Sequence, residues 1–170
     1  MIEFKELKTN TFQFCLTGDS RNIDIFAATE KRNLEYSEIL KNKKISGIFS
    51  SPPYVGLIDY HEQHAYAYDL FKLDRKDKLE IGPLFKGQGR EAQESYVSGI
   101  SDVLSNCKKF MRNDYNVFLV ANDKFNLYPR IAEKSGMKII NQFRRPVLNR
   151  TEKDKGAYSE IIFHLKEVDN

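Results

Sequence analysis

The sequence predicts one α/β domain with a mainly parallel sheet that is closed by a C-terminal antiparallel hairpin. Two short apolar runs, 45–49 and 115–121, are typical of buried strands, and a long segment with helical spacing lies between them. Strand and helix patterns alternate until residue 136, after which two strand patterns follow each other. A chain of 170 residues suits one domain, and alternation of this kind favours the α/β class.

The N-terminal part of the chain predicts a strand followed by helical structure. Within the segment 2–17, Phe12, Phe14 and Leu16 alternate with other residues, which is the period of a strand. Gly18-Asp19 ends that pattern, and apolar residues then recur at helical spacing through 20–42. The basic run at the end of this segment fits a solvated face better than a binding patch.

The apolar run 45–49 ends at the segment Ser-Pro-Pro-Tyr of residues 51–54, which we call the SPPY turn. Neither proline has an N–H group to continue a strand ladder, so the chain must leave the sheet there and can become helical from residue 57 to residue 71. Ligands of open α/β sheets bind at the carboxyl ends of strands, which makes the SPPY turn a candidate site. An ordinary turn, or a polyproline ligand of an adaptor domain, also accounts for these four residues alone.

The residues of the SPPY turn suit the binding of a planar base with an exocyclic amino group. The prolines fix the directions of two carbonyl acceptors, Ser51 adds a side-chain acceptor and Tyr54 offers a flat face for stacking. An aromatic amine is a weak nucleophile because its lone pair is delocalised into the ring. Two acceptors that hold its hydrogens would free the lone pair for attack on an electrophilic methyl group.

The rest of the chain continues the alternation of helices and strands. Its expected elements are a helix over 93–112, a turn at 113–114, a strand over 115–121, a helix over 127–135 and strands over 137–147 and 158–167. Gly136 is expected as the C-cap residue of the second helix. Segments 45–49 and 117–121 are expected to be adjacent parallel strands in the centre of the sheet, because a crossover helix connects them.

Composition narrows the classes of protein to consider. The chain is 41% hydrophobic and 30% charged, which is typical of a globular protein and not of a disordered one. No apolar stretch approaches the ~20 residues of a membrane span, and the N-terminus lacks the apolar core of a signal peptide. Cys15 and Cys107 lie outside any Cys/His cluster, so we expect reduced thiols in a cytoplasmic protein. The net charge of +3 permits nucleic-acid binding without arguing for it.

The SPPY turn resembles the catalytic motif of the amino-methylating DNA methyltransferases, in which Ser, Asp or Asn precedes Pro-Pro and an aromatic residue. The Ser form is usual in enzymes that methylate cytosine N4, and the Asp or Asn form in those that methylate adenine N6. Flanking segments resemble the same family: LTGDSR at 16–21, LIDY at 57–60, RRP at 144–146 and SEII at 159–162. The resemblance covers roughly residues 12 to 166.

The resemblance implies a partial Rossmann-like methyltransferase fold and a site-specific, S-adenosylmethionine-dependent DNA methyltransferase, with cytosine N4 favoured over adenine N6. The motif residues that would be catalytic are Ser51, Pro52, Pro53 and Tyr54. Asp19 and Ser50 would contact the cofactor, although a turn or a helix N-cap also accounts for Asp19. The alternatives are an inactive remnant or DNA-binding module of this family, and a methyltransferase of RNA or protein. Protein-glutamine methyltransferases carry Asn where this chain has Ser51.

Contacts with DNA are expected from residues after the SPPY turn and from basic positions. These residues are Asp59, Tyr60, Lys86, Arg90, Arg144, Arg145 and Arg150. Two of them lie in the irregular stretch 72–92, where basic residues among glycines could meet phosphates; solvated surface charges are the alternative. His61 and His64 share a helical face but lack a clear third ligand, so no metal site is predicted. They are expected to line the site entrance or to bond to the neighbouring loop.

One element of the family is absent from the 170 residues. The resembling enzymes bind the methionine end of S-adenosylmethionine on a Gly-rich loop of the form Asp-Pro-Phe-x-Gly-x-Gly, at a helix N-terminus. The chain is therefore expected to be a catalytic half that binds S-adenosylmethionine weakly or not at all by itself. We expect either a second chain that carries the Gly-rich loop or a self-association that covers the apolar edge of the sheet.

Overall fold

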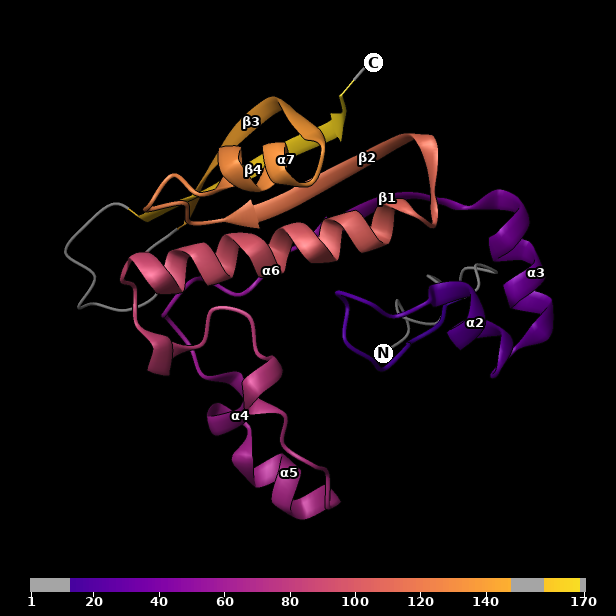
Figure 1. The fold of residues 1–170 in the computed structure, drawn as a ribbon, viewed down its shortest axis with the longest axis horizontal. Coiled ribbons are helices and arrows are strands. Elements are labelled where there is room, and N and C mark those ends of the chain that lie inside the picture. The colour runs from indigo at the N-terminus through magenta and orange to yellow at the C-terminus, as the bar shows by residue number, and fades with distance from the viewer. Residues whose placement is uncertain (1–12, 148–157, 169–170) are drawn as a thin grey trace, which may run out of the picture.

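The computed structural model describes residues 13–147 and 158–168, which we call the described residues. Their strands form one four-stranded sheet in the order β1-β2-β4-β3 (Figure 1). The strands are β1 (Ile45–Ser50), β2 (Met111–Ala121), β3 (Met137–Val147) and β4 (Tyr158–Glu167). The sequence thus predicted the positions of all four strands closely.

The sheet is mixed. β1 pairs with β2 in parallel, so the prediction of adjacent parallel strands at 45–49 and 117–121 is confirmed. The prediction of a mainly parallel sheet is wrong, because β4 pairs antiparallel with both β2 and β3. The helix that connects β2 to β3 suggested that these two strands pair in parallel. In the structure, β4 lies between them and pairs with both. β1 lies at an edge of the sheet and not in its centre. The residues that join β3 to β4 lie outside the described residues.

Two helices pack on one face of the sheet. α6 (Arg90–Lys108) connects β1 to β2, and α7 (Tyr128–Lys134) connects β2 to β3. The C-cap residue of α7 is Ser135 and not Gly136 as predicted; Gly136 follows it with φ +66°, the left-handed conformation that glycine favours just after a helix. The turn predicted at 113–114 is wrong, because β2 is continuous from Met111. Residues 112–115 fall in a register shift between the pairs Ile45–Met111 and Gly47–Asn116, so a local turn signal became a bulge within the strand.

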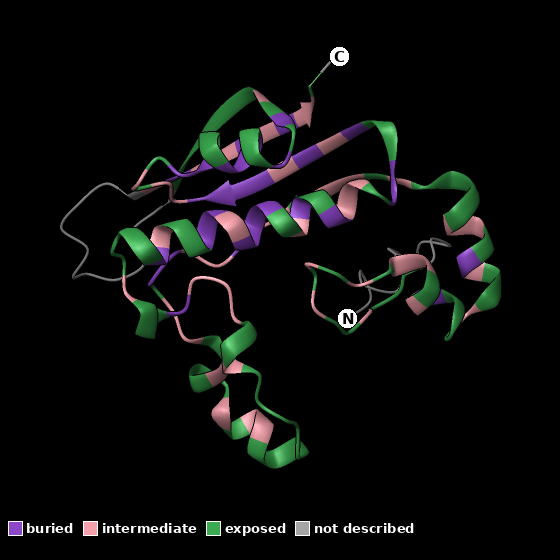
Figure 2. Ribbon diagram, viewed as in Figure 1, coloured by how far each residue is buried: buried purple, intermediate pink, exposed green. Residues whose placement is uncertain are grey.

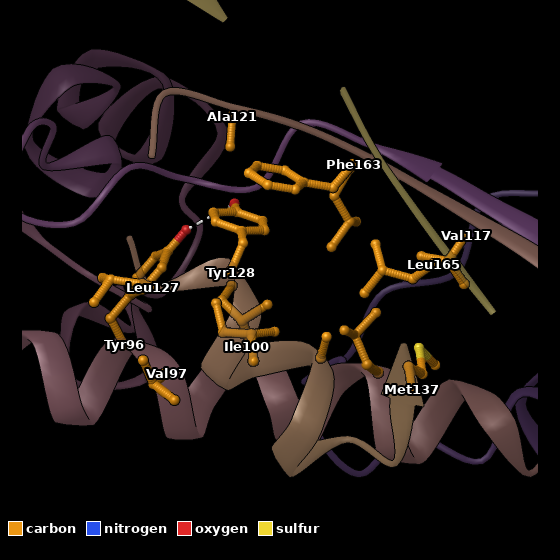
Figure 3. Close-up of a cluster of buried hydrophobic side chains, with 14 of the residues drawn as sticks. Tyr96, Val97, Ile100, Val117, Ala121, Leu127, Tyr128, Met137, Phe163 and Leu165 are labelled. Carbon is orange, nitrogen blue, oxygen red and sulfur yellow. Dashed lines mark hydrogen bonds between the residues drawn. The ribbon is translucent and has the colours of Figure 1, made fainter. Parts of the chain in front are cut away.

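The core lies between these helices and the sheet (Figures 2 and 3). Its buried side chains include Val97, Ile100, Val117, Leu119, Ile131 and Leu165. The Tyr128 ring stacks on Phe163 with a centroid separation of 4.6 Å, and the hydroxyls of Tyr128 and Tyr96 are 3.1 Å apart. Burial raises the pKa of Tyr96 to about 12. This aromatic group joins α6 and α7 to β4.

The N-terminal region differs in part from its prediction. Residues 13–17 form no strand, and the rest of the segment 2–17 lies outside the described residues. Among the described residues, no strand pairs with residues 13–17, and Phe14 of the alternating pattern is 37% exposed instead of buried. The helical prediction for 20–42 is confirmed as two helices, α2 (Ile25–Glu30) and α3 (Leu34–Lys43). Their N-caps are Asp24 and Asn33, whose side chains accept backbone hydrogen bonds.

The segment after the SPPY turn forms a helical arm that projects away from the sheet (Figure 1). Its helices are α4 (Tyr60–Gln63) and α5 (Ala65–Phe71). Two 3₁₀ turns, η1 (Asp77–Leu79) and η2 (Leu84–Lys86), lie within the irregular stretch that leads to α6. Among the described residues, no helix is both long and apolar enough to span a bilayer.

Candidate functional site

The SPPY turn lies at the carboxyl end of β1, beside the carboxyl end of β2. Ser50, the last residue of β1, pairs with Leu119 near the end of β2. The chain then runs through residues 51–54 without regular structure and turns at 55–57. Pro52 and Val55 are buried, whereas Ser51 is exposed. The prolines therefore anchor the turn in the protein and leave the serine hydroxyl accessible.

A cavity of about 630 Å³ lies on one side of the SPPY turn. Asp19, Ser50, Pro52 and Pro53 all line it, so the structure brings the residues expected to contact the cofactor together with the two prolines. The loop before α2, the helical arm, residues 76–81 of the irregular stretch and α6 supply the other walls. Of the histidines considered at the site entrance, His61 lines the cavity.

Asp19 is held in place by its neighbour Arg21. The guanidinium Nη2 of Arg21 lies 2.6 Å from Asp19 Oδ2, and the Arg21 backbone N–H donates to Oδ1 at 3.0 Å. Hydrogen bonds from the Arg21 side chain lower the pKa of Asp19. The Asp19 carbonyl also accepts bonds from the N–H groups of Asn22 and Ile23, as in a turn. Asp19 is not the cap of α2, a place that Asp24 takes.

Three buried polar atoms on the segments that follow the SPPY turn have no hydrogen-bond partner among the described residues. They are Asp59 Oδ1, His61 Nδ1 and Glu80 Oε2. Glu80 and His61 line the cavity, and the other oxygen of Glu80 accepts the Tyr60 backbone N–H at 2.6 Å. Buried polar atoms without partners are costly, so these positions suit a polar ligand. Within the described residues, no group of three metal-binding side chains is arranged to hold a metal ion.

Tyr54 faces a second, smaller cavity of about 200 Å³. Phe125, Asn122, Lys124 and Gln88 line it with Tyr54, and Phe125 and Asn122 follow the carboxyl end of β2. The sequence predicted one concave site shared by Ser51, the Pro52 carbonyl and Tyr54. In the structure, the SPPY turn separates two cavities, with the prolines on one and Tyr54 on the other. Phe125 and Asn122 were not predicted, although the sequence places them just after an apolar strand.

The Tyr54 hydroxyl is bound by a buried carboxylate that sequence reasoning missed. It donates to Glu160 Oε1 at 2.8 Å, and Glu160 is only 5% exposed. Arg145 Nη2 lies 3.2 Å from Glu160 Oε2. An acidic residue directly before the apolar run of residues 161–163 is the signal that could have identified this position.

The irregular stretch 72–92 supports the SPPY turn. Gly56 N–H donates to the Gly82 carbonyl at 2.9 Å, and Leu84 N–H donates to the Ile58 carbonyl at 3.2 Å. Gly56 has φ +61°, and a Cβ atom there would lie well inside 3.0 Å of the Gly87 carbonyl oxygen. The close approach of these two segments therefore requires a glycine at position 56.

The positions expected to contact DNA are spread over several elements. Lys86 is exposed in η2, and Arg90 is the exposed first residue of α6. Arg144 and Arg145 are exposed on β3, and Arg145 reaches the carboxylate that binds Tyr54. Asp59 precedes α4, of which Tyr60 is the first residue. Arg150 lies outside the described residues.

Comparison with known proteins relates the chain to a methyltransferase. Over 164 residues it is 54% identical to the type II methyltransferase M.MjaII of Methanocaldococcus jannaschii. The alignment covers 96% of this chain and 31% of the relative, so the chain spans about a third of the relative's length. No protein-family model matches the chain, and no solved structure matches it significantly. The resemblance to a partial methyltransferase is therefore confirmed.

Proposed function

We propose that this chain is the catalytic half of an S-adenosylmethionine-dependent DNA methyltransferase that acts on an exocyclic amino group, cytosine N4 in preference to adenine N6. The observation that carries the proposal is the SPPY turn at the carboxyl end of β1, in a chain 54% identical to part of a type II methyltransferase. The flanking segments that resemble DNA methyltransferases support DNA as the substrate. The serine at position 51 supports cytosine N4 as the target.

The larger cavity is the proposed site of S-adenosylmethionine, which supplies an electrophilic methyl group on a sulfonium. Asp19 and Ser50 line this cavity, as does Glu80 with its buried partnerless oxygen. Carboxylates suit the positive charge of a sulfonium and the ammonium of a methionine end. The donor set of the cavity therefore fits the cofactor, although the Gly-rich loop that would hold its methionine end is absent from the chain.

The smaller cavity is the proposed site of the target base. An enzyme that acts on a base must take it out of the stack and place it in a pocket, where an aromatic side chain can stack on it. Tyr54 and Phe125 supply aromatic surface, and the amide of Asn122 can bond to a base edge. Pro52 lines the larger cavity, whereas Ser51 is exposed and lines neither cavity. The Ser51 hydroxyl and the Pro52 carbonyl would accept the hydrogens of the amino group and stabilise the charge that develops at nitrogen.

A further polypeptide segment would complete this site. β1 lies at the edge of the sheet, and Phe49 on it is 77% exposed. A strand edge with exposed apolar side chains is suited to pairing with another strand. We propose that the segment with the Gly-rich loop pairs with β1, whether it lies on a second chain or elsewhere in a longer protein. Self-association that covers β1 is the alternative.

Reconstitution tests this function. The chain is combined with a polypeptide that corresponds to the part of M.MjaII outside the alignment, and methyl transfer from labelled S-adenosylmethionine to DNA is measured. Mass spectrometry of the digested DNA identifies the product nucleoside, and N4-methylcytosine is expected. The substitution Ser51→Ala should remove methyl transfer and leave the circular dichroism spectrum unchanged.

Ser95→Ala is the matched control, because Ser95 is an exposed serine of α6, away from the SPPY turn and from the edge of β1. It should methylate DNA at the rate of the unaltered chain. Undiminished methylation by the Ser51→Ala variant would exclude the proposed role of Ser51. Detection of N6-methyladenine would exclude the preference for cytosine. Transfer of the labelled methyl group to RNA or protein, with none to DNA, would favour the alternative substrates.

A further inference from the structure

We infer that Glu160 is a positioning residue that fixes the Tyr54 ring at the wall of the smaller cavity, with Arg145 as its counter-charge. The inference rests on the proposed function, in which Tyr54 stacks on the target base. It assigns a role to a buried carboxylate that has no part in the chemistry described above. It also gives Arg145 a role within the protein, where the sequence suggested a contact with DNA.

The bond between Tyr54 and Glu160 joins two parts of the fold that are 106 residues apart in sequence. Tyr54 lies in the turn that follows β1, whereas Glu160 lies on β4, on the far side of β2. The neighbouring residue Ile161 pairs with Ala121, the last residue of β2. The carboxylate therefore stands at the carboxyl edge of the parallel strands, level with the SPPY turn.

A buried carboxylate at this position needs an explanation. Removing a charge from water is costly unless hydrogen bonds and an opposite charge compensate, and an apolar residue would pack at the site at no such cost. Here each oxygen has its own partner: Oε1 accepts from Tyr54 and Oε2 faces the guanidinium of Arg145. Arg145 therefore compensates the charge without displacing the tyrosine hydroxyl.

The effect of the carboxylate is to fix the orientation of an aromatic ring. Tyr54 packs against the core on one side and lines the smaller cavity on the other, together with Phe125. With its hydroxyl bound to a charged acceptor, the ring is anchored at both ends, and hydrogen bonds to charged groups are the stronger kind. A base would then stack on a surface that is already in place, and the protein would not have to order the ring on binding.

Three substitutions test the inference in the completed enzyme. Glu160→Gln keeps an acceptor, Glu160→Leu removes it, and Tyr54→Phe removes the donor but keeps the ring. We expect Glu160→Leu to reduce kcat/KM for DNA by at least about tenfold, and Glu160→Gln to retain most of the activity. In the Tyr54→Phe background, Glu160→Leu should change kcat/KM by no more than about twofold, because the bond is already absent. Glu133→Gln, at an exposed position of α7, is the control and should have no effect.

A second measurement needs no methyl transfer. In the chain labelled with ¹³C at its tyrosine rings, the Tyr54 signal is identified by its loss in Tyr54→Phe. We expect this signal to shift and to average over ring flips in Glu160→Leu, and to stay near its position in Glu160→Gln. An unchanged Tyr54 signal in Glu160→Leu, or a loss of kcat/KM that is equal with and without the Tyr54→Phe substitution, overturns the inference. A signal that responds while the completed enzyme transfers no methyl group overturns the proposed function and leaves the positioning role intact.

Discussion

The substitution Gly56→Ala should destabilise the chain through a clash between two backbone segments. Gly56 has φ +61°, a conformation that costs a residue with a Cβ atom about 1–2 kcal/mol. A Cβ atom at this position would also lie well inside 3.0 Å of the Gly87 carbonyl oxygen, which is backbone and cannot rotate away. Separation of the two segments would strain the Gly56–Gly82 hydrogen bond, and overpacking of this kind costs about 1–3 kcal/mol.

Gly136 supplies a control for this prediction. Its φ of +66° is close to that of Gly56, but the nearest atom to a Cβ there is the end of the flexible Lys108 side chain, Nζ at 3.2 Å. Gly136→Ala therefore carries mainly the conformational cost, about 1–2 kcal/mol. The difference between the two variants isolates the cost of the clash, for which we expect about 1–3 kcal/mol.

Urea unfolding followed by circular dichroism measures both variants, with the free energy of unfolding obtained by linear extrapolation. The completed enzyme should also lose methyl transfer in Gly56→Ala, because the SPPY turn would move, and retain it in Gly136→Ala. Equal free energies of unfolding for the two variants would refute the reasoning, since they would show that the stretch 72–92 does not hold the turn at the distance described.

Three further predictions concern the cofactor, the core and pH. Titration calorimetry of the isolated chain should detect no binding of S-adenosylmethionine, because several hydrogen bonds of ~0.5–1.5 kcal/mol each are missing with the Gly-rich loop; micromolar binding by a monomer would contradict the proposed half-enzyme. Tyr128→Phe should cost about 1–3 kcal/mol of unfolding free energy, because it removes the hydroxyl partner of buried Tyr96, and adding Tyr96→Phe should recover part of the loss; a double variant with the summed cost of both would disprove this coupling. Hydrogen bonds from the Arg21 side chain lower the pKa of Asp19 in the folded chain. Ionised Asp19 therefore stabilises the folded chain at pH values above its ordinary pKa, and this stabilisation is lost as the pH falls through the lower pKa of the folded state. In Arg21→Gln, the free energy of unfolding in urea should depend less on pH over the acid range. The same dependence on pH in the variant and the unaltered chain would argue against a stabilising Asp19–Arg21 pair.

The sequence predicts those parts of the fold that depend on local pattern and on one crossover. The parallel pairing of β1 and β2 follows from two apolar runs and the helix between them. The insertion of β4 between β2 and β3 has no local signal, since it depends on which strand edge the last segment reaches. The wrong turn at 113–114 has a related cause: β2 pairs with β1 before these residues, at Met111, and after them, from Asn116 on, so they form a bulge within the strand.

The candidate site, too, could be predicted from the sequence only where it depends on local residues. The chemistry of the SPPY turn could be inferred from its residues, because prolines restrict the backbone in any context. The arrangement of two cavities could not, because it depends on Phe125 and Asn122, which belong to another strand end. The long-range bond between Tyr54 and Glu160 could not be predicted from the sequence either, although an acidic residue directly before the apolar run 161–163 was visible.

The position of β4 in the sheet determines when this chain can complete its fold during synthesis. β1, β2 and β3 leave the ribosome before β4, which lies between β2 and β3 in the sheet. Until residues 158–167 are available, β2 has an unpaired apolar edge and Tyr54 lacks its carboxylate partner. Pairings between distant segments form slowly, and exposed strand edges promote aggregation while they wait. The nascent chain is therefore most in need of protection by chaperones in the interval between synthesis of its second strand and synthesis of its last.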